Sequence, residues 1–226
     1  MKYQETRELI CDICKKMWQL GWVAANDGNV SVKLDDDIFI ATPTGISKSF
    51  IKPNMLVVIN KKGEILETEG NYKPSSEIKM HLRCYQDRED IGAVVHAHPP
   101  TATGFAVAHI PIDVYSMIET VIAIGSVPVT PYATPSTYEV PEAIAPFIKE
   151  HDVVLLENHG ALSLGADLIT AYYRMETLEL QAKISLTARL LGGEKEISSD
   201  NIERLISMRK DYKVTGRHPG YKKYST

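Results

Sequence analysis

Short stretches of strand length alternate along this chain with longer stretches of helical periodicity, and this alternation limits the possible folds more than any other feature. The spacing of apolar residues predicts a helix at 9–20 and hairpins at 30–40 and 56–66. Further strands are predicted at 91–98, 125–129, 153–156 and 161–164, and further helices after residue 74, at 101–109, 139–150 and 167–191, and from residue 200. Hairpins interleaved with helices favour a mostly antiparallel sheet covered on both faces.

The length and composition are those of an ordinary globular domain. The chain has 226 residues, of which 44% are hydrophobic and 24% charged, so it can bury a core without disulfide staples. Disordered and fibrous classes are therefore excluded. Because no repeat, low-complexity segment or linker interrupts the chain, we expect residues 1–226 to form a single domain.

The charge balance and the cysteine count indicate which binding partners and which cellular compartment to expect. The 25 basic and 29 acidic residues give a net charge of −4, which argues against nucleic-acid and membrane partners. Three cysteines are an odd, low number that suits a reducing compartment better than a disulfide framework. The N-terminus has no apolar signal-peptide core, and no run approaches 18 apolar residues. We therefore expect a cytoplasmic protein.

Three histidines form the strongest chemical signal. His96 and His98 lie in the strand predicted at 91–98, and residues two apart in a strand point to the same face. His159 lies between two predicted strands, beside Gly160, where the backbone can turn sharply. Three histidine ligands with one open position describe a catalytic zinc site. A His-x-His pair also occurs in strands that bind nothing, so the spacing alone leaves this assignment open.

Three loops share the features of an anion site. Ser75 and Ser76 precede a predicted helix, where hydroxyls and free N–H groups can receive an anion. The segments 28–29 and 42–45 combine a glycine with a side-chain donor next to a predicted strand. Taken one at a time, each is more simply interpreted as a helix cap or an ordinary turn than as an anion site.

Taken together, five segments resemble the class II aldolase/adducin family, and the similarity covers nearly the whole chain. The segments are Gly28-Asn29-Val30-Ser31, Thr42-Pro43-Thr44-Gly45, Pro74-Ser75-Ser76-Glu77, Val95-His96-Ala97-His98 and Asn158-His159-Gly160, with Pro131-Tyr132-Ala133-Thr134 as a further match. The resemblance implies a three-layer α/β/α fold around a mostly antiparallel sheet. It also implies a homotetramer with active sites between subunits and one Zn²⁺ per subunit.

The resemblance carries roles over to individual positions. His96, His98 and His159 match zinc ligands, and Glu77 matches an acid/base residue that can also ligate the resting metal. The phosphate cradle matches Gly28, Asn29, Thr44, Gly45, Ser75 and Ser76. Tyr212 aligns with a tyrosine of a mobile C-terminal tail, and a tyrosine supplied by the neighbouring subunit falls near Tyr115 and Ser116. Shortly after these residues, Glu119 stands where the family pattern has a small residue, and its side chain can alter which aldehyde is accepted.

These roles imply a zinc-dependent aldolase that reversibly cleaves a ketose 1-phosphate to dihydroxyacetone phosphate and an aldehyde. L-fuculose 1-phosphate, which releases L-lactaldehyde, is the expected substrate, and 5-deoxyribulose 1-phosphate is an alternative. An L-ribulose-5-phosphate 4-epimerase is a second alternative, but that enzyme carries Asp where this chain has Glu77. A non-enzymatic adducin-like interaction domain is disfavoured because the chain keeps its three histidines and Glu77.

Overall fold

The computed structural model describes residues 3–224, which contain one eight-stranded sheet. Its strands are β1 (Asn29–Asp35), β2 (Ile38–Ala41), β3 (Val57–Asn60), β4 (Ile65–Glu67), β5 (Ala93–Ala97), β6 (Val129–Thr130), β7 (Val153–Leu156) and β8 (Gly160–Gly165). Their order is β4-β3-β2-β1-β5-β8-β7-β6, and every neighbouring pair is antiparallel except β6–β7. The prediction of a mostly antiparallel sheet is confirmed.

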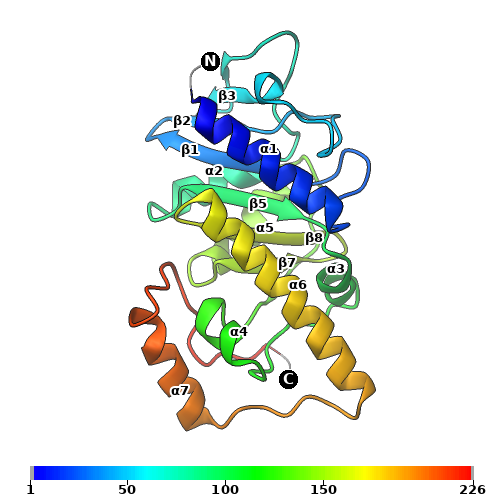
Figure 1. Ribbon diagram of the computed structural model, residues 1–226, viewed down its shortest axis with the longest axis vertical. Coiled ribbons are helices and arrows are strands. Elements are labelled where there is room, and N and C mark those ends of the chain that lie inside the picture. Colours follow the sequence, from blue (N-terminus) through cyan, green and yellow to red (C-terminus); the bar gives the residue numbers. More distant parts are fainter. Residues whose placement is uncertain (1–2, 225–226) are drawn as a thin grey trace.

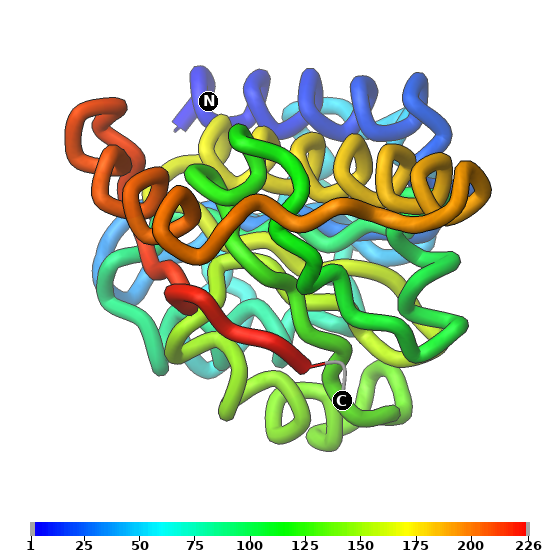
Figure 2. Tube along the Cα trace, turned by 90° about the horizontal axis from the view of Figure 1, so that it is seen from below, coloured from blue at the N-terminus to red at the C-terminus, as the bar shows by residue number. Residues whose placement is uncertain are grey.

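Helices cover both faces of this sheet, which gives the molecule three layers (Figures 1 and 2). α1 (Gln4–Gln19) and α6 (Leu168–Leu190) lie on one face, and α2 (Ile78–Asp87) and α5 (Glu139–Ile148) lie on the other. Successive residues of β5 serve the two cores in turn, because Val95 packs on the α1–α6 side and Val94 packs on the α2–α5 side. The predicted α/β/α architecture is therefore confirmed.

Local sequence features explain why two of the long helices form and where α6 starts. α1 buries Ile10, Ile13, Cys14 and Met17, which recur at helical spacing along one face. Asp167 is the N-cap of α6, because its carboxylate accepts a hydrogen bond of 2.7 Å from the backbone N–H of Thr170. No helix within residues 3–224 is both long enough and apolar enough to cross a membrane.

Beyond the β6 edge, the chain builds a smaller cluster of helices (Figure 1). Its members are α4 (Ile118–Ala123) and α7 (Ser199–Ser207), which pack through Tyr115, Val121 and Ile202. The remaining short elements are α3 (Pro100–Val107) after β5, η1 (Pro53–Met55) and η2 (Met208–Lys210). The tube in Figure 2 shows the C-terminal segment running beside the chain that leads to β6.

The structure corrects two strand boundaries. The strand predicted at 125–129 is reduced to β6, and Val127 forms only an isolated bridge with Ile112. Pro128 and Pro131 lack the N–H groups that a longer strand would need at these positions. The strand predicted at 91–98 ends at Ala97, because the two prolines at 99–100 stop it, so His98 lies just beyond β5. The helix α4 was not predicted.

Candidate metal and phosphate site

Strand register brings the first site residues together. β1 and β5 pair antiparallel with Asn29 directly opposite His96, so both side chains leave the same face as neighbours. On the other side of β5, the register pairs Ala97 with Ala161, which places His98 opposite the β7–β8 turn that carries His159. The middle of the sheet therefore gathers residues that lie far apart in the sequence.

The three predicted histidines form a cluster in which the candidate ligand atoms all lie within 4.8 Å of one another. The Nε2 atoms of His96 and His98 are 3.2 Å apart, and the ring of His159 lies 4.7 Å from that of His96 and 5.1 Å from that of His98, centroid to centroid. Gly160 permits this packing, because a Cβ at that position would lie 2.5 Å from the His98 ring. The three imidazoles can therefore share one cation.

The hydrogen bond of His96 leaves one nitrogen free for a metal. Its Nδ1 donates to the backbone oxygen of Ala161 at 2.9 Å, so Nε2 keeps its lone pair and points into the cluster. Burial lowers the pKa of His96 well below its ordinary value, and burial also lowers the pKa of His98. Both rings are thus held in the neutral form that a metal requires.

Glu77 completes the cluster from the residue that precedes α2. Its Oε2 lies 3.4 Å from His96 Nε2, and its Oε1 lies 3.4 Å from His159 Nε2. Asn29 Nδ2 donates to Oε2 at 2.7 Å, whereas Oε1 is buried and has no hydrogen-bond partner among residues 3–224. Three imidazoles beside a carboxylate oxygen that accepts no hydrogen bond among residues 3–224 fit a zinc ion, which takes nitrogen and oxygen ligands and keeps an open position in catalytic sites.

Next to this cluster lies a polar cavity of about 180 Å³. Among its lining residues are Gly28, Asn29, Thr44, Ser75, Ser76, Glu77, His98 and His159. Gly45 is adjacent in the chain but does not itself line the cavity. An antiparallel bridge between Pro43 and Pro74 draws two of the predicted anion loops together. The cavity therefore joins the phosphate-binding residues expected from the sequence to the histidine cluster.

Gly28 has a conformation and a position that strongly disfavour any side chain. Its φ is +71°, and a Cβ there would lie 2.5 Å from Val23 Cγ1 and 3.0 Å from the backbone oxygen of His96. We expect Gly28→Ala to cost about 2–4 kcal/mol of stability and to weaken phosphate binding, as measured by denaturant unfolding and calorimetry. Gly21→Ala is the matched control, because Gly21 has the same φ of +71° but no atom within 4 Å of its Cβ position. Equal losses in the two variants would contradict the steric explanation.

A second layer of hydrogen bonds behind Glu77 was not predicted. The carboxylate draws the amide nitrogen of Asn29 toward itself, so Asn29 Oδ1 accepts from His81 Nε2 at 2.5 Å. His81 Nδ1 then accepts from the hydroxyl of Ser31 at 2.7 Å, and burial lowers the pKa of His81 to about 3. The spacing of four residues between Glu77, which precedes α2, and His81, in the first turn of α2, was the available signal, since residues four apart at a helix start lie on the same side.

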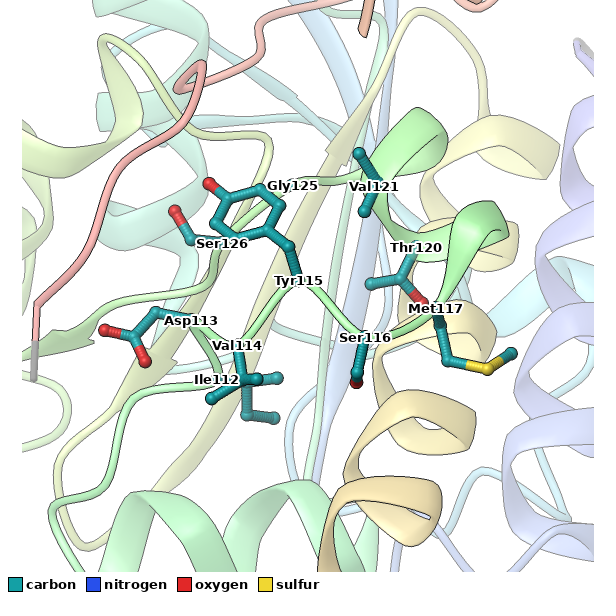
Figure 3. Close-up of a pocket in the computed structure, with 10 residues that line it drawn as sticks. All are labelled: Ile112, Asp113, Val114, Tyr115, Ser116, Met117, Thr120, Val121, Gly125 and Ser126. Atoms are coloured by element: carbon teal, nitrogen blue, oxygen red, sulfur yellow. The ribbon is translucent and has the colours of Figure 1, made fainter. Parts of the chain in front are cut away.

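The two predicted tyrosines lie elsewhere, and neither lines this cavity within the described chain. The buried Tyr115 hydroxyl donates to the backbone oxygen of Gly220 at 2.7 Å. In Figure 3 its ring extends toward Ser126, whereas Ser116 points the other way. Tyr212 follows η2 and is 60% exposed. Arg209 connects the segment around Tyr212 to α4, because its guanidinium donates to the backbone oxygens of Ala123 and Thr215.

Comparison with known proteins assigns the class. Residues 8–186 match the model of the class II aldolase and adducin N-terminal domain, so the chain belongs to the class II aldolase/adducin family. L-fuculose phosphate aldolase of Escherichia coli O6:H1 is 32% identical over 216 residues, covering 96% of this chain and 98% of that protein. The 5-deoxy-D-ribulose 1-phosphate aldolase of Bacillus thuringiensis serovar kurstaki is 32% identical over 213 residues, covering 94% and 99%. A solved structure of L-fuculose 1-phosphate aldolase superposes with a TM-score of 0.85 at 32% identity, covering 93% of this chain and 98% of the other.

Proposed function

We propose that this protein is a zinc-dependent aldolase that reversibly cleaves a ketose 1-phosphate into dihydroxyacetone phosphate and an aldehyde. The observation that carries the proposal is the position of Glu77, which lines the polar cavity and whose Oε1 lies 3.4 Å from His159 Nε2 and accepts no hydrogen bond among residues 3–224. A phosphate held beside Ser75 and Ser76 places the neighbouring carbon atoms of the same molecule next to this carboxylate. Family membership and the names of two relatives support the same reaction.

In this proposal, His96, His98 and His159 hold one Zn²⁺ per subunit, and Glu77 is an additional ligand in the resting enzyme. When bound, zinc supplies a Lewis acid that stabilises negative charge on the substrate's ketone oxygen. Phosphate is bound by backbone N–H groups and side chains of the cradle, namely Gly28, Asn29, Thr44, Gly45, Ser75 and Ser76. The chain therefore needs no Schiff-base lysine for this reaction.

Glu77 is the proposed acid/base group for the carbon next to the ketone. Its backbone N–H donates to the Ser75 hydroxyl at 3.3 Å, so the phosphate-binding serine and the carboxylate are fixed relative to each other. Asn29 holds Oε2 and leaves Oε1 facing the cluster. A tyrosine, either Tyr212 of the C-terminal segment or Tyr115 supplied by a neighbouring subunit, is proposed to exchange a proton with the aldehyde oxygen.

L-fuculose 1-phosphate, cleaved to dihydroxyacetone phosphate and L-lactaldehyde, is the first candidate substrate, in line with the Escherichia coli relative. The Bacillus relative supports 5-deoxyribulose 1-phosphate as a second candidate at the same identity, 32%. Glu77 argues against an L-ribulose-5-phosphate 4-epimerase, which has Asp there. The complete histidine cluster argues against an adducin-like domain that only binds partners.

The proposal extends to assembly and location. We propose that residues 1–226 form one domain and assemble as a homotetramer with active sites at the subunit interfaces. We also propose a cytoplasmic location. The proposed partner is a small-molecule sugar phosphate, and we expect no binding to nucleic acid or membranes. An interface site also explains why the cavity of one chain contains neither predicted tyrosine.

A panel of ketose 1-phosphates tests the proposed function. The metal-loaded protein is incubated with L-fuculose 1-phosphate, 5-deoxyribulose 1-phosphate and L-ribulose 5-phosphate, and released dihydroxyacetone phosphate is measured with a coupled dehydrogenase. We expect release from a ketose 1-phosphate and none from L-ribulose 5-phosphate. If the protein epimerises L-ribulose 5-phosphate and releases no dihydroxyacetone phosphate from any ketose 1-phosphate, the proposed aldolase activity is wrong and the protein is the 4-epimerase.

A further inference from the structure

Lys48 is a buried lysine that lies behind the cavity. Only 2% of its surface is exposed, although a lysine is rarely buried without a partner. Its Nζ donates to the backbone oxygen of Asn26 at 3.1 Å and to that of Ile46 at 3.2 Å. Asn26 lines the cavity, and Ile46 follows the predicted anion loop at 42–45. One ammonium group therefore ties together the backbones of two loops that border the cavity.

The charges around the cavity require such a cation. Asp27 and Glu77 both line it, and none of the described residues that line it is a lysine or an arginine. A phosphate monoester that enters as a dianion therefore meets two carboxylates. Hydroxyls and N–H groups offset part of this repulsion, but they carry no full charge. The residues that line the cavity therefore give the phosphate no side chain with a full positive charge, and the proposed metal would be its only opposite charge there.

Electrostatics connect Lys48 to these groups. Burial lowers the pKa of Lys48, while Cys14 and the carboxylates of Asp27 and Glu77 act in the opposite direction. Lys48 is therefore near enough to both carboxylates of the cavity to interact with them electrostatically, and its burial reduces screening by water. The two carbonyl hydrogen bonds leave the third N–H of the ammonium group without a described hydrogen bond.

We propose that Lys48 is the built-in cation of the phosphate cradle, a positioning residue that holds the loops at 26–28 and 44–46 together and compensates the charge of a phosphate monoester. This inference rests on the proposed function, because it assigns the phosphate group of the substrate to this cavity. It adds a residue outside the predicted cradle. Lys48 acts through the loop backbone and through its electric field, so it need not contact the substrate.

Phosphate affinity tests this role without requiring turnover. Binding of inorganic phosphate to the full-length, metal-loaded protein is measured by calorimetry at fixed ionic strength for the native chain, Lys48→Met, Lys48→Arg and the control Lys52→Met, which removes an exposed lysine. We expect Lys48→Met to weaken binding about tenfold or more, with Lys48→Arg and Lys52→Met close to native. In turnover assays, Lys48→Met should raise KM for the phosphorylated substrate while kcat is largely kept.

Two results would overturn the inference. The first is native phosphate affinity in Lys48→Met. The second is an equal loss of affinity in Lys48→Met and Lys48→Arg with lowered melting temperatures in both, which assigns Lys48 to stability alone. If Lys48→Met does not fold, Lys48→Gln takes its place in the same comparison. A protein that cleaves no ketose 1-phosphate but loses phosphate affinity with Lys48→Met refutes the proposed function and not the role of Lys48.

Discussion

Removing the metal with a chelator is expected to abolish ketose 1-phosphate cleavage, and adding Zn²⁺ is expected to restore it. The reason is that His96, His98 and His159 offer nitrogen ligands to a cation, and the proposed reaction needs that cation to stabilise a negative oxygen. Because fixed electrostatic stabilisation commonly contributes more to catalysis than any other single effect, the rate should fall by at least about 10³-fold. Activity is measured before and after dialysis against chelator, together with zinc content by atomic absorption.

The variant His96→Ala supplies an independent readout. It removes the fully buried proposed ligand, whose Nδ1 donates to the backbone oxygen of Ala161, and it should lower the zinc content of the purified protein from about one ion per subunit to nearly none. Circular dichroism shows whether the fold is retained. Full activity in a preparation shown to be free of metal would end the proposed mechanism, whereas activity restored by another divalent ion would change only the identity of the metal.

Glu77→Gln is expected to reduce kcat by about 10²–10⁴-fold, because the amide cannot accept a proton at the position of Oε1. The substitution conserves size, and its amide oxygen can still accept the hydrogen bond from Asn29. The cradle should therefore remain intact, and phosphate affinity should stay within a few fold of the native value. Steady-state kinetics and phosphate calorimetry on the same preparation measure both effects.

Glu64→Gln is the matched control, because Glu64 is exposed, does not line the cavity, and forms its hydrogen bonds with Asn60 in the β3–β4 hairpin. It should leave kcat unchanged. Near-native turnover in Glu77→Gln would remove Glu77 from the acid/base role, and a parallel loss of phosphate affinity would indicate a disturbed cavity instead of a missing proton acceptor.

Much of the candidate site could be predicted because its residues stand in short segments with distinctive chemistry. A His-x-His pair at the end of an apolar run, a histidine before a glycine, and serines before a helix each carry a local signal. The sheet and its two helical layers followed from periodicity for the same reason. Local patterns therefore indicated the fold class, and their combined resemblance to one family selected many of the residues that line the cavity.

What escaped prediction depends on contacts between distant segments. The pairing of Asn29 with His96 is a matter of register between strands, which periodicity does not specify. His81 and Lys48 are ordinary residues of a helix and a loop until the tertiary structure buries them behind the cavity. The strand predicted at 125–129 is too long because hydrophobic periodicity does not register the missing N–H groups of the prolines.

The position of β5 between β1 and β8 has a consequence for dynamics. These three strands are the fourth, fifth and sixth of the eight, so transient fraying at the outer strands β4 and β6 leaves their ladder closed. Amide protons of Val94 and Val95 should accordingly exchange with deuterated solvent more slowly than those of the margins. The proposed reaction centre thus lies in the region expected to open last, and partial unfolding at the periphery is compatible with a working enzyme.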